Sequence, residues 1–211
     1  MSRQPVVIEV DDHVTLEGGF SLPAQPRGAA LILHPHPLYG GSMDNNVVLA
    51  LAGAATEAGW AALRINFRGV GRSTGSHDEG RGEQQDVIAA AKWLAAQTPG
   101  PLVLMGYSFG SLVGARAAGR VAGLAGCVWI SPPYVLGDLP PWPAGAGPLL
   151  VITGEHDEYG DLTRLRAYIQ AMGALGTLKV HPGGDHFWWS GLSALQEQTT
   201  TFLGQLAAGG Q

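Results

Sequence analysis

A serine lies between two glycines where an apolar run gives way to a helical pattern. The segment from 102 to 110 is Leu-Val-Leu-Met-Gly-Tyr-Ser-Phe-Gly, which places G-x-S-x-G between a predicted strand and a predicted helix. A sharp turn there exposes the hydroxyl of Ser108 beside a helix N-terminus, whose dipole favours developing negative charge. Side chains at Gly106 and Gly110 would clash with the neighbouring strand and helix. The pattern alone is weak, but its placement predicts a nucleophile rather than an incidental serine in a glycine-rich turn.

A serine nucleophile needs a base, and the base needs a group that orients it. In a strand–turn–helix site of this kind, the expected chain order is serine, then acid, then histidine. Three histidines follow Ser108, namely His156, His181 and His186. His186 follows the last predicted strand, in Gly-Gly-Asp-His-Phe, where a loop can carry its ring to the serine. His156 precedes that strand and His181 ends it, so we predict His186 as the base.

The predicted acid is Asp157, which comes just past the end of an apolar strand. Glu155 and Glu158 flank it and could instead pair with solvent or an arginine. Asp161 suits the N-cap of the helix that follows. Asp138, in the preceding loop, is a less favoured acid.

Two backbone N–H groups are expected to form an oxyanion hole. One belongs to the residue after the nucleophile, Phe109, and the other to the loop after an early strand. That loop is His-Pro-His-Pro-Leu-Tyr-Gly-Gly from 34 to 41, and its prolines have no N–H to offer. His36, held between the prolines, is therefore the preferred second donor, with Leu38 as the next choice.

Other readings of these segments are weaker. His34 and His36 could be metal ligands together with His156 or His186, but an H-x-H pair without a clear third ligand is a weak signal, and His34 fits a hydrogen-bonded core position. The glycine-rich segment 67–75 lacks the lysine of a phosphate-binding P-loop. We interpret it as a structural connector and expect no metal and no cofactor.

The composition limits the classes of partner and location. The chain of 211 residues has a formal net charge of −5 and no basic stripe, so a nucleic-acid partner is not expected. Because Cys127 is the only cysteine, an internal disulfide and a zinc site made of several cysteines are excluded. The first ten residues lack the charged and apolar pattern of a signal peptide, and no apolar run reaches about 18 residues. We therefore expect a cytoplasmic protein without a membrane partner, with residues 1–211 forming one domain.

The elements that must position these residues alternate along the chain. Strands are expected at 6–10, 14–20, 29–34, 61–67, 102–106, 124–130, 149–153 and 177–181, and helices at 45–57, 84–96, 109–119, 162–172 and 193–206. Asp44 is a candidate N-cap for the first helix. Alternation of helices with continuously apolar strands predicts a mostly parallel sheet covered on both faces. Functional residues in such a sheet gather at the carboxyl ends of the strands.

Taken together, these motifs resemble the α/β-hydrolase superfamily over nearly the whole chain, from about 29 to 206. The closest group is that of small bacterial α/β-hydrolases without a cap, near the dienelactone hydrolases and short-chain esterases. The matching stretches are 34–41, 43–46, 66–73, 106–110 and 183–187. The resemblance implies a twisted α/β-hydrolase sheet, a triad of Ser108, Asp157 and His186, and oxyanion-hole positions at His36 and Phe109. Dienelactone hydrolases use a cysteine nucleophile, and this chain departs from them by having Ser108.

The segment 132–147 lies where many members of the superfamily insert a helical cap. It has 16 residues, of which five are proline and three are glycine, so it is not expected to form helices. We predict an open site without a cap domain. Aromatic and apolar side chains are candidates to line its mouth and bind substrate: Tyr39, Leu38, Tyr134, Trp142, Trp188 and Trp189, with Trp188 preferred for its closeness to His186.

These residues predict a serine hydrolase that cleaves small carboxylic esters by acyl transfer. The same triad could serve a thioesterase, a peptidase or an acyltransferase, and a non-catalytic binding protein of this fold is an alternative from another class. A small-molecule ester is the expected partner. The apolar last segment and low charge are compatible with a homodimer, although nothing in the sequence requires one.

Overall fold

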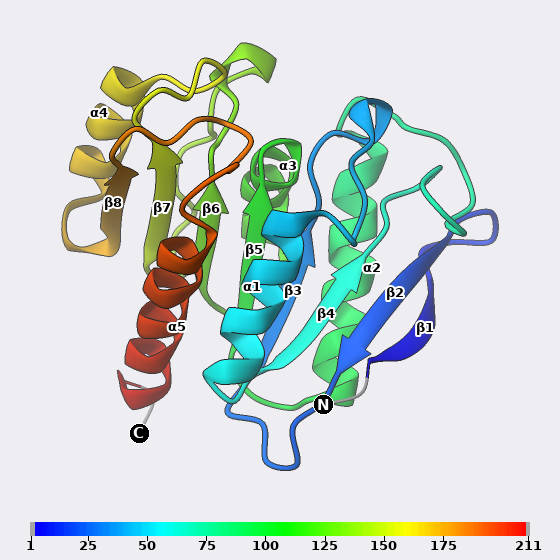
Figure 1. Cartoon of the computed structure of the whole chain (residues 1–211). Helices are drawn as coiled ribbons and strands as arrows, with labels where there is room; N and C mark the ends of the chain where they lie inside the picture. The colour runs from blue at the N-terminus through cyan, green and yellow to red at the C-terminus, as the bar shows by residue number, and fades with distance from the viewer. Residues whose placement is uncertain (1–2, 210–211) are drawn as a thin grey trace.

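The computed structural model describes residues 3–209, in which eight strands form one sheet (Figure 1). The strands are β1 (Gln4–Glu9), β2 (Thr15–Ser21), β3 (Ala29–Leu33), β4 (Ala61–Ile65), β5 (Leu102–Tyr107), β6 (Leu124–Ile130), β7 (Leu149–Gly154) and β8 (Gly176–His181). The α-helices are α1 (Asn46–Glu57), α2 (Gly82–Gln97), α3 (Phe109–Ala117), α4 (Leu162–Met172) and α5 (Leu192–Gly209). Every strand and helix expected from the sequence forms, with differences of a few residues at the ends.

The strands lie in the order β1-β2-β4-β3-β5-β6-β7-β8. The pairs β1–β2 and β2–β4 are antiparallel, and all other neighbours are parallel. The predicted mostly parallel sheet is thus confirmed. The chain moves outward from β3 to β4 and then returns to place β5 on the other side of β3. This reversal creates a crevice at the carboxyl ends of β3 and β5, where ligands bind in sheets of this kind.

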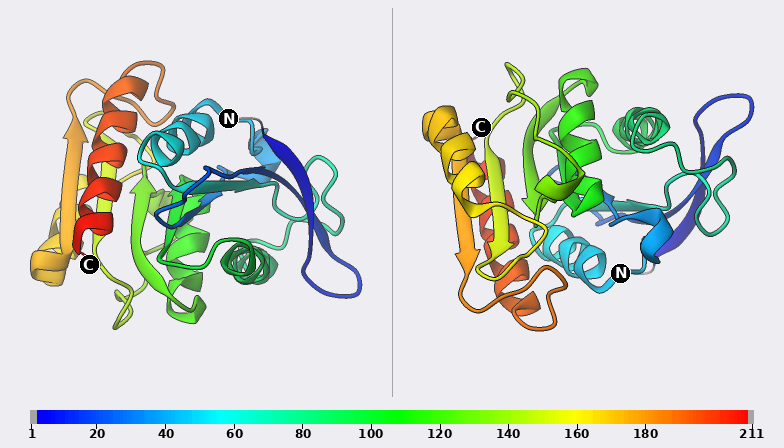
Figure 2. Two further views of the ribbon diagram at one scale, coloured as in Figure 1. Left: turned by 90° about the horizontal axis from the view of Figure 1, so that it is seen from below. Right: turned by 90° about the horizontal axis from the view of Figure 1, so that it is seen from above.

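Helices cover both faces of the sheet, as the alternation predicts (Figure 2). One buried cluster joins the sheet to α2, α3 and α4, and a second joins it to α1 and α5. The strands supply both clusters because successive side chains point to opposite faces. In β5, Leu104 belongs to the first cluster and Val103 and Met105 to the second. Continuously apolar strands are needed for that double burial.

The start of α1 differs from the sequence prediction. Asn45, rather than Asp44, is the N-cap, and its side chain accepts a hydrogen bond from the N–H of Val47. The Asp44 carboxylate instead contacts Arg3 and Arg64. The N-cap predicted at Asp161 is confirmed, since its carboxylate accepts a hydrogen bond from the N–H of Arg164.

No cap domain interrupts the described chain. Within residues 3–209, the connection from β6 to β7 contains a single turn of 3₁₀ helix, Tyr134–Leu136, and is otherwise irregular. This confirms the prediction from its proline and glycine content. Over the same residues, no helix combines the length and apolar character that crossing a membrane requires.

Candidate active site

Ser108 occupies the turn between β5 and α3, and its backbone is in an unusual conformation. Its φ is 52° and its ψ is −120°, a region that non-glycine residues rarely adopt and that stores strain. A Cβ atom at Gly106 would lie 2.5 Å from the carbonyl carbon of Gly110, and one at Gly110 would lie 2.5 Å from the carbonyl oxygen of Leu33. Both positions therefore need glycine, for the steric reason expected from the sequence. The turn holds the hydroxyl at the crevice between β3 and β5.

The structure brings the three predicted residues Ser108, His186 and Asp157 into one hydrogen-bonded chain. The Oγ atom of Ser108 is 2.9 Å from Nε2 of His186. The Nδ1 atom of the same ring is 2.8 Å from Oδ1 of Asp157. Ser108 follows β5, Asp157 follows β7 and His186 follows β8, so three strand ends supply the three side chains. A carboxylate on Nδ1 places the proton there and leaves Nε2 free to accept the serine proton.

Asp157 is held as a carboxylate by its surroundings. Its Oδ1 also accepts hydrogen bonds from the N–H groups of Tyr159 and Gly160, at 3.0 and 3.1 Å. The hydroxyl of Thr153 contacts its Oδ2 at 3.2 Å. Burial alone would raise the pKa of Asp157. The hydrogen bond and electrostatic attraction of His186, with smaller contributions that include the N–H of Tyr159, lower the pKa below 3.8.

Three of the other carboxylates considered from the sequence have structural partners elsewhere, and the fourth, Glu158, is exposed. Glu155 accepts a hydrogen bond from the N–H of Gly183. Asp138 pairs with Arg164, and Asp161 caps α4. The geometry thus singles out Asp157 as the carboxylate that contacts His186.

The proposed oxyanion donors are free to bind a ligand. The N–H groups of Phe109, the first residue of α3, and of His36, in the loop after β3, have no hydrogen-bond partner within residues 3–209. The N–H of Leu38 is instead directed to the Nδ1 atom of His36 at 3.3 Å, so Leu38 is a poorer donor candidate. The rings of His36 and Phe109 are in contact, with centroids 4.9 Å apart. This contact joins the loop after β3 to the start of α3, the two segments that carry these N–H groups.

A second buried carboxylate, Glu83, is linked through His77 to these two segments, and sequence reasoning did not connect it with them. Glu83 in α2 accepts hydrogen bonds from the N–H groups of Asp78 and Gly80, and its Oε1 is 2.8 Å from Nδ1 of His77. The His77 ring packs against His36, at a centroid distance of 4.9 Å. Glu83 lies in the first turn of α2, where a negative charge suits the helix dipole. Its link to His77 depends on how the loop folds, which no local pattern reveals.

His34 is a structural histidine, as expected. Its Nδ1 is 2.6 Å from the carbonyl oxygen of Pro35, and its Nε2 accepts a hydrogen bond from the N–H of Phe67. Burial lowers its pKa to about 4, so the ring is neutral at pH 7. Both ring nitrogens are occupied, which argues against His34 as a metal ligand. Among the described residues, no three His, Cys, Asp or Glu side chains are arranged to hold a metal ion.

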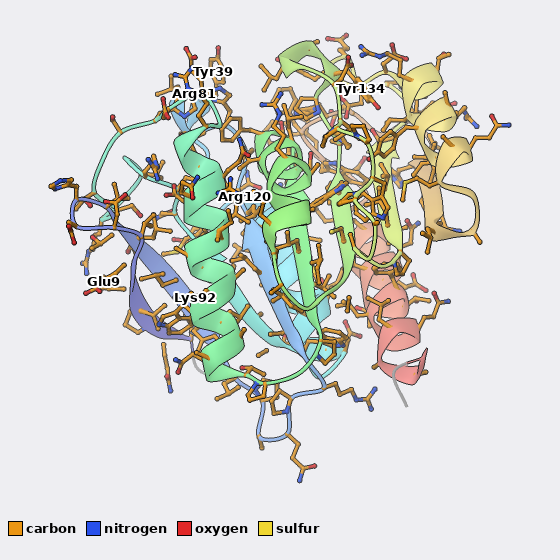
Figure 3. All side chains as sticks on the ribbon, turned by 180° about the vertical axis from the view of Figure 1, so that it is seen from behind. Glu9, Tyr39, Arg81, Lys92, Arg120 and Tyr134 are labelled. Carbon is orange, nitrogen blue, oxygen red and sulfur yellow. The ribbon has the colours of Figure 1, made fainter. Side chains whose placement is uncertain are left out.

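A cavity of about 470 Å³ opens above Ser108 and His186. Of the residues predicted to bind substrate, Tyr39 lines it, and Figure 3 places Tyr39 at the carboxyl end of the parallel strands. Leu38 does not line the cavity, and neither does Tyr134, whose ring lies 4.4 Å from the guanidinium carbon of Arg164.

The prediction for Trp188 is wrong. Its side chain is only 1% exposed and belongs to the core shared with α1 and α5. Its indole N–H donates to the hydroxyl of Ser131 at 3.1 Å. Trp188 has a φ of 58°, and this turn of the backbone lets the indole enter the core beneath His186. Trp142 and Trp189 also lie outside the cavity lining.

The apolar wall of the cavity is made by residues that sequence reasoning missed: Val135, Leu136, Tyr159 and Phe187. Two of them had a usable signal, since Tyr159 and Phe187 come within two positions of Asp157 and His186. Tyr107 was also missed. Its hydroxyl donates to the carbonyl oxygen of His186 at 2.8 Å and anchors that loop.

The chain is similar to known proteins in both sequence and fold. Residues 29–205 match the family model described as an alpha/beta hydrolase domain. A protein of Rickettsia prowazekii, described as uncharacterized, is 32% identical over 187 residues, covering 82% of this chain and 77% of its own.

Two solved structures are similar along their whole length. An alpha-beta serine hydrolase homologue from Coxiella burnetii is 30% identical, with a TM-score of 0.83 over 96% of this chain and 98% of its own. A serine hydrolase without a lid from Xanthomonas campestris is 33% identical, with a TM-score of 0.83 over 95% of this chain and 93% of its own. The α/β-hydrolase fold inferred from the sequence is therefore confirmed, and so is the absence of a cap.

Proposed function

The chain belongs to the alpha/beta hydrolase domain family, and from this premise we propose that it is a serine hydrolase that cleaves small carboxylic esters. The observation that carries the proposal is the continuous contact from Ser108 Oγ through the His186 ring to Asp157, at 2.9 and 2.8 Å. Both distances suit proton transfer and orientation of the base. The free N–H groups of His36 and Phe109 support it, because acyl transfer develops negative charge on the carbonyl oxygen.

In the proposed reaction, Ser108 Oγ forms a bond to the ester carbonyl carbon while His186 Nε2 takes the serine proton. The carbonyl oxygen becomes an oxyanion and accepts hydrogen bonds from His36 N–H and Phe109 N–H. Loss of one such donor typically raises the barrier by about 3 kcal/mol. Asp157 stabilises the imidazolium that forms on His186.

The tetrahedral intermediate then collapses and the bond from carbon to the alcohol oxygen breaks. His186 gives its proton to the departing alcohol, which leaves an acyl group on Ser108. A water molecule, deprotonated by His186, attacks that acyl group in the second half of the cycle. The acid product departs and Ser108 recovers its proton. All proton transfers pass through one imidazole nitrogen.

The test pairs covalent labelling with turnover. Wild type and Ser108→Ala are treated with a fluorophosphonate probe, and labelling is measured by mass spectrometry. Hydrolysis of nitrophenyl esters from acetate to long acyl chains is measured in parallel. We expect labelling and turnover in wild type alone. Thermal unfolding transitions of both proteins should show that Ser108→Ala is folded. Wild-type-like turnover in Ser108→Ala would contradict the proposal, and a folded wild type without labelling or turnover would favour the binding-protein alternative.

A further inference from the structure

Exposed apolar side chains are concentrated around the candidate active site. All four exposed aromatic residues, Tyr39, Tyr159, Phe187 and Trp189, lie on loops that follow strands at the carboxyl end of the parallel sheet. Soluble proteins rarely gather such side chains on one surface without a binding role. Tyr39, Tyr159 and Phe187 also line the cavity, together with Val135 and Leu136 of the β6–β7 connection.

The cavity wall has no permanently charged side chain. None of the described residues that line it is Asp, Glu, Lys or Arg, and its histidines are His36 and His186. Burial, followed by repulsion from His77, lowers the pKa of His36, which favours its neutral ring. A charged substituent entering the cavity would lose hydration and gain no partner of opposite charge, which is costly.

The position of His186 distinguishes the two sides of the ester. The alcohol oxygen must come within hydrogen-bond reach of His186 Nε2 to receive its proton. The alcohol group therefore lies on the His186 side of the cavity. Tyr159 and Phe187 flank that ring, with centroids 4.5 and 5.5 Å from it.

Tyr159 and Phe187 together form a corner suited to a flat apolar group. Their rings are 5.9 Å apart and meet edge to face, at 82°. The two side chains are 41% and 49% exposed, so each presents a free surface. Aromatic groups pack favourably in such arrangements beyond the burial of their area.

We propose that this corner is a leaving-group subsite that selects esters of uncharged alcohols with an apolar ring, held against Tyr159 and Phe187. The inference rests on the proposed function, since it assigns the alcohol side from the proton transfer by His186. It assigns specificity to residues that take no part in the bond-making steps.

The test uses three acetate esters that differ only in the alcohol: benzyl, 4-carboxybenzyl and ethyl. Acetate release is followed at pH 7.5 and about 0.15 M salt, where distant charges are largely screened. In wild type, we expect kcat/KM for benzyl acetate to exceed that for 4-carboxybenzyl acetate by about tenfold or more, and also to exceed that for ethyl acetate.

Phe187 and Trp189 form a matched pair for mutation. Both are aromatic and exposed on the same loop, but only Phe187 lines the cavity. We expect Phe187→Lys to shift the ratio of the two benzyl esters toward the carboxylate by about tenfold or more, and Trp189→Lys to leave that ratio within about twofold. Likewise, Phe187→Ala should lower the preference for benzyl over ethyl acetate, and Trp189→Ala should not.

The outcomes separate this inference from the function on which it rests. Equal kcat/KM for the three esters, with turnover that depends on Ser108, overturns the subsite and leaves the serine hydrolase standing. Equal shifts from the two lysine variants also overturn it, because they would reflect net charge alone. Failure of wild type to hydrolyse any of the esters, or retention of its rates by Ser108→Ala, overturns both.

Discussion

Two buried carboxylate–histidine pairs lie at the carboxyl end of the sheet, and only one of them contacts the proposed nucleophile, Ser108. In both Asp157–His186 and Glu83–His77, a carboxylate oxygen lies 2.8 Å from Nδ1 of the imidazole. The carboxylates are 2% and 0% exposed. In both, the carboxylate also accepts hydrogen bonds from backbone N–H groups within five positions of it along the chain.

The pairs differ in alignment and in what the far side of the ring meets. The Nδ1 atom of His186 makes a hydrogen bond with Asp157, whereas that of His77 has no hydrogen-bond partner among the described residues despite its short distance. The Nε2 atom of His186 contacts Ser108, whereas the ring of His77 packs against His36 and Phe109. A buried carboxylate beside an imidazole is therefore no mark of catalysis by itself. In the first pair the carboxylate contacts the proposed base His186, and in the second it lies next to His77, whose ring packs against His36 and Phe109, the residues of the proposed oxyanion donors.

The largest expected effect separates the two pairs directly. Asp157→Asn should lower the kcat/KM of ester hydrolysis by about 10⁴-fold, because an amide no longer fixes the tautomer or stabilises the imidazolium. The measurement is steady-state kinetics on a nitrophenyl ester. Asp161→Asn is the control, since it makes the same chemical change four residues away and keeps a good N-cap. Near-normal activity in Asp157→Asn would remove the distinction between the pairs.

A histidine without a carboxylate partner sharpens the comparison. The pKa of His34 is lowered from 6.5 to about 4, so the unfolded chain binds this proton more readily than the folded one. Stability from neutral His34 is complete above about pH 6.5 and is lost as the pH falls toward 4, by about 3 kcal/mol. We expect urea unfolding of wild type to show this decline and His34→Gln to flatten it. An equally steep decline of stability with falling pH in His34→Gln would show that another group takes up the proton.

The second pair should matter more to stability than to chemistry. Glu83→Gln would set an amide NH₂ against a backbone N–H of Asp78 or Gly80, at a cost of about 2 kcal/mol of unfolding free energy. We expect kcat/KM to fall by less than about tenfold. Thermal and urea unfolding together with ester kinetics check this, and the exposed neighbour Glu79→Gln is the control. An activity loss as large as that of Asp157→Asn would give the two pairs the same role.

The smallest expected effect concerns the anchor of the His186 loop. Tyr107→Phe removes the hydroxyl that donates to the carbonyl oxygen of His186, and we expect it to cost about 1 kcal/mol of stability. Because the Asp157–His186 hydrogen bond remains, kcat/KM should change by only a few fold. Denaturant unfolding and ester kinetics measure both quantities. A drop of about a hundredfold or more in kcat/KM would show that this anchor, and not the carboxylate, sets the position of the ring.

The sequence predicted those parts of the molecule that depend on local pattern. Apolar periodicity located every strand, and the glycines on either side of Ser108 identified the turn because no side chain fits there. The chain order of acid and histidine then pointed to Asp157 and His186, which the structure brings together with Ser108.

What the sequence missed depends on packing between distant segments. Trp188 stands two residues from His186, but a positive φ directs its indole into the core. Val135 and Leu136 reach the cavity because of the path of an irregular connection, which carries no periodic signal. The first helix begins one residue later than expected, with Asn45 as its N-cap, while Asp44 pairs with Arg3 and Arg64, which are distant in sequence.

The uncapped connection between β6 and β7 has a kinetic consequence for the proposed reaction. With no cap to close, the substrate can reach the nucleophile without a preceding conformational step, so encounter and product release need not wait for slow domain motion. Ser108 lines an open cavity, so water would reach the proposed acyl-enzyme without a cap having to move. Because water far outnumbers any other acceptor, we expect such an intermediate to be hydrolysed in preference to transferring its acyl group.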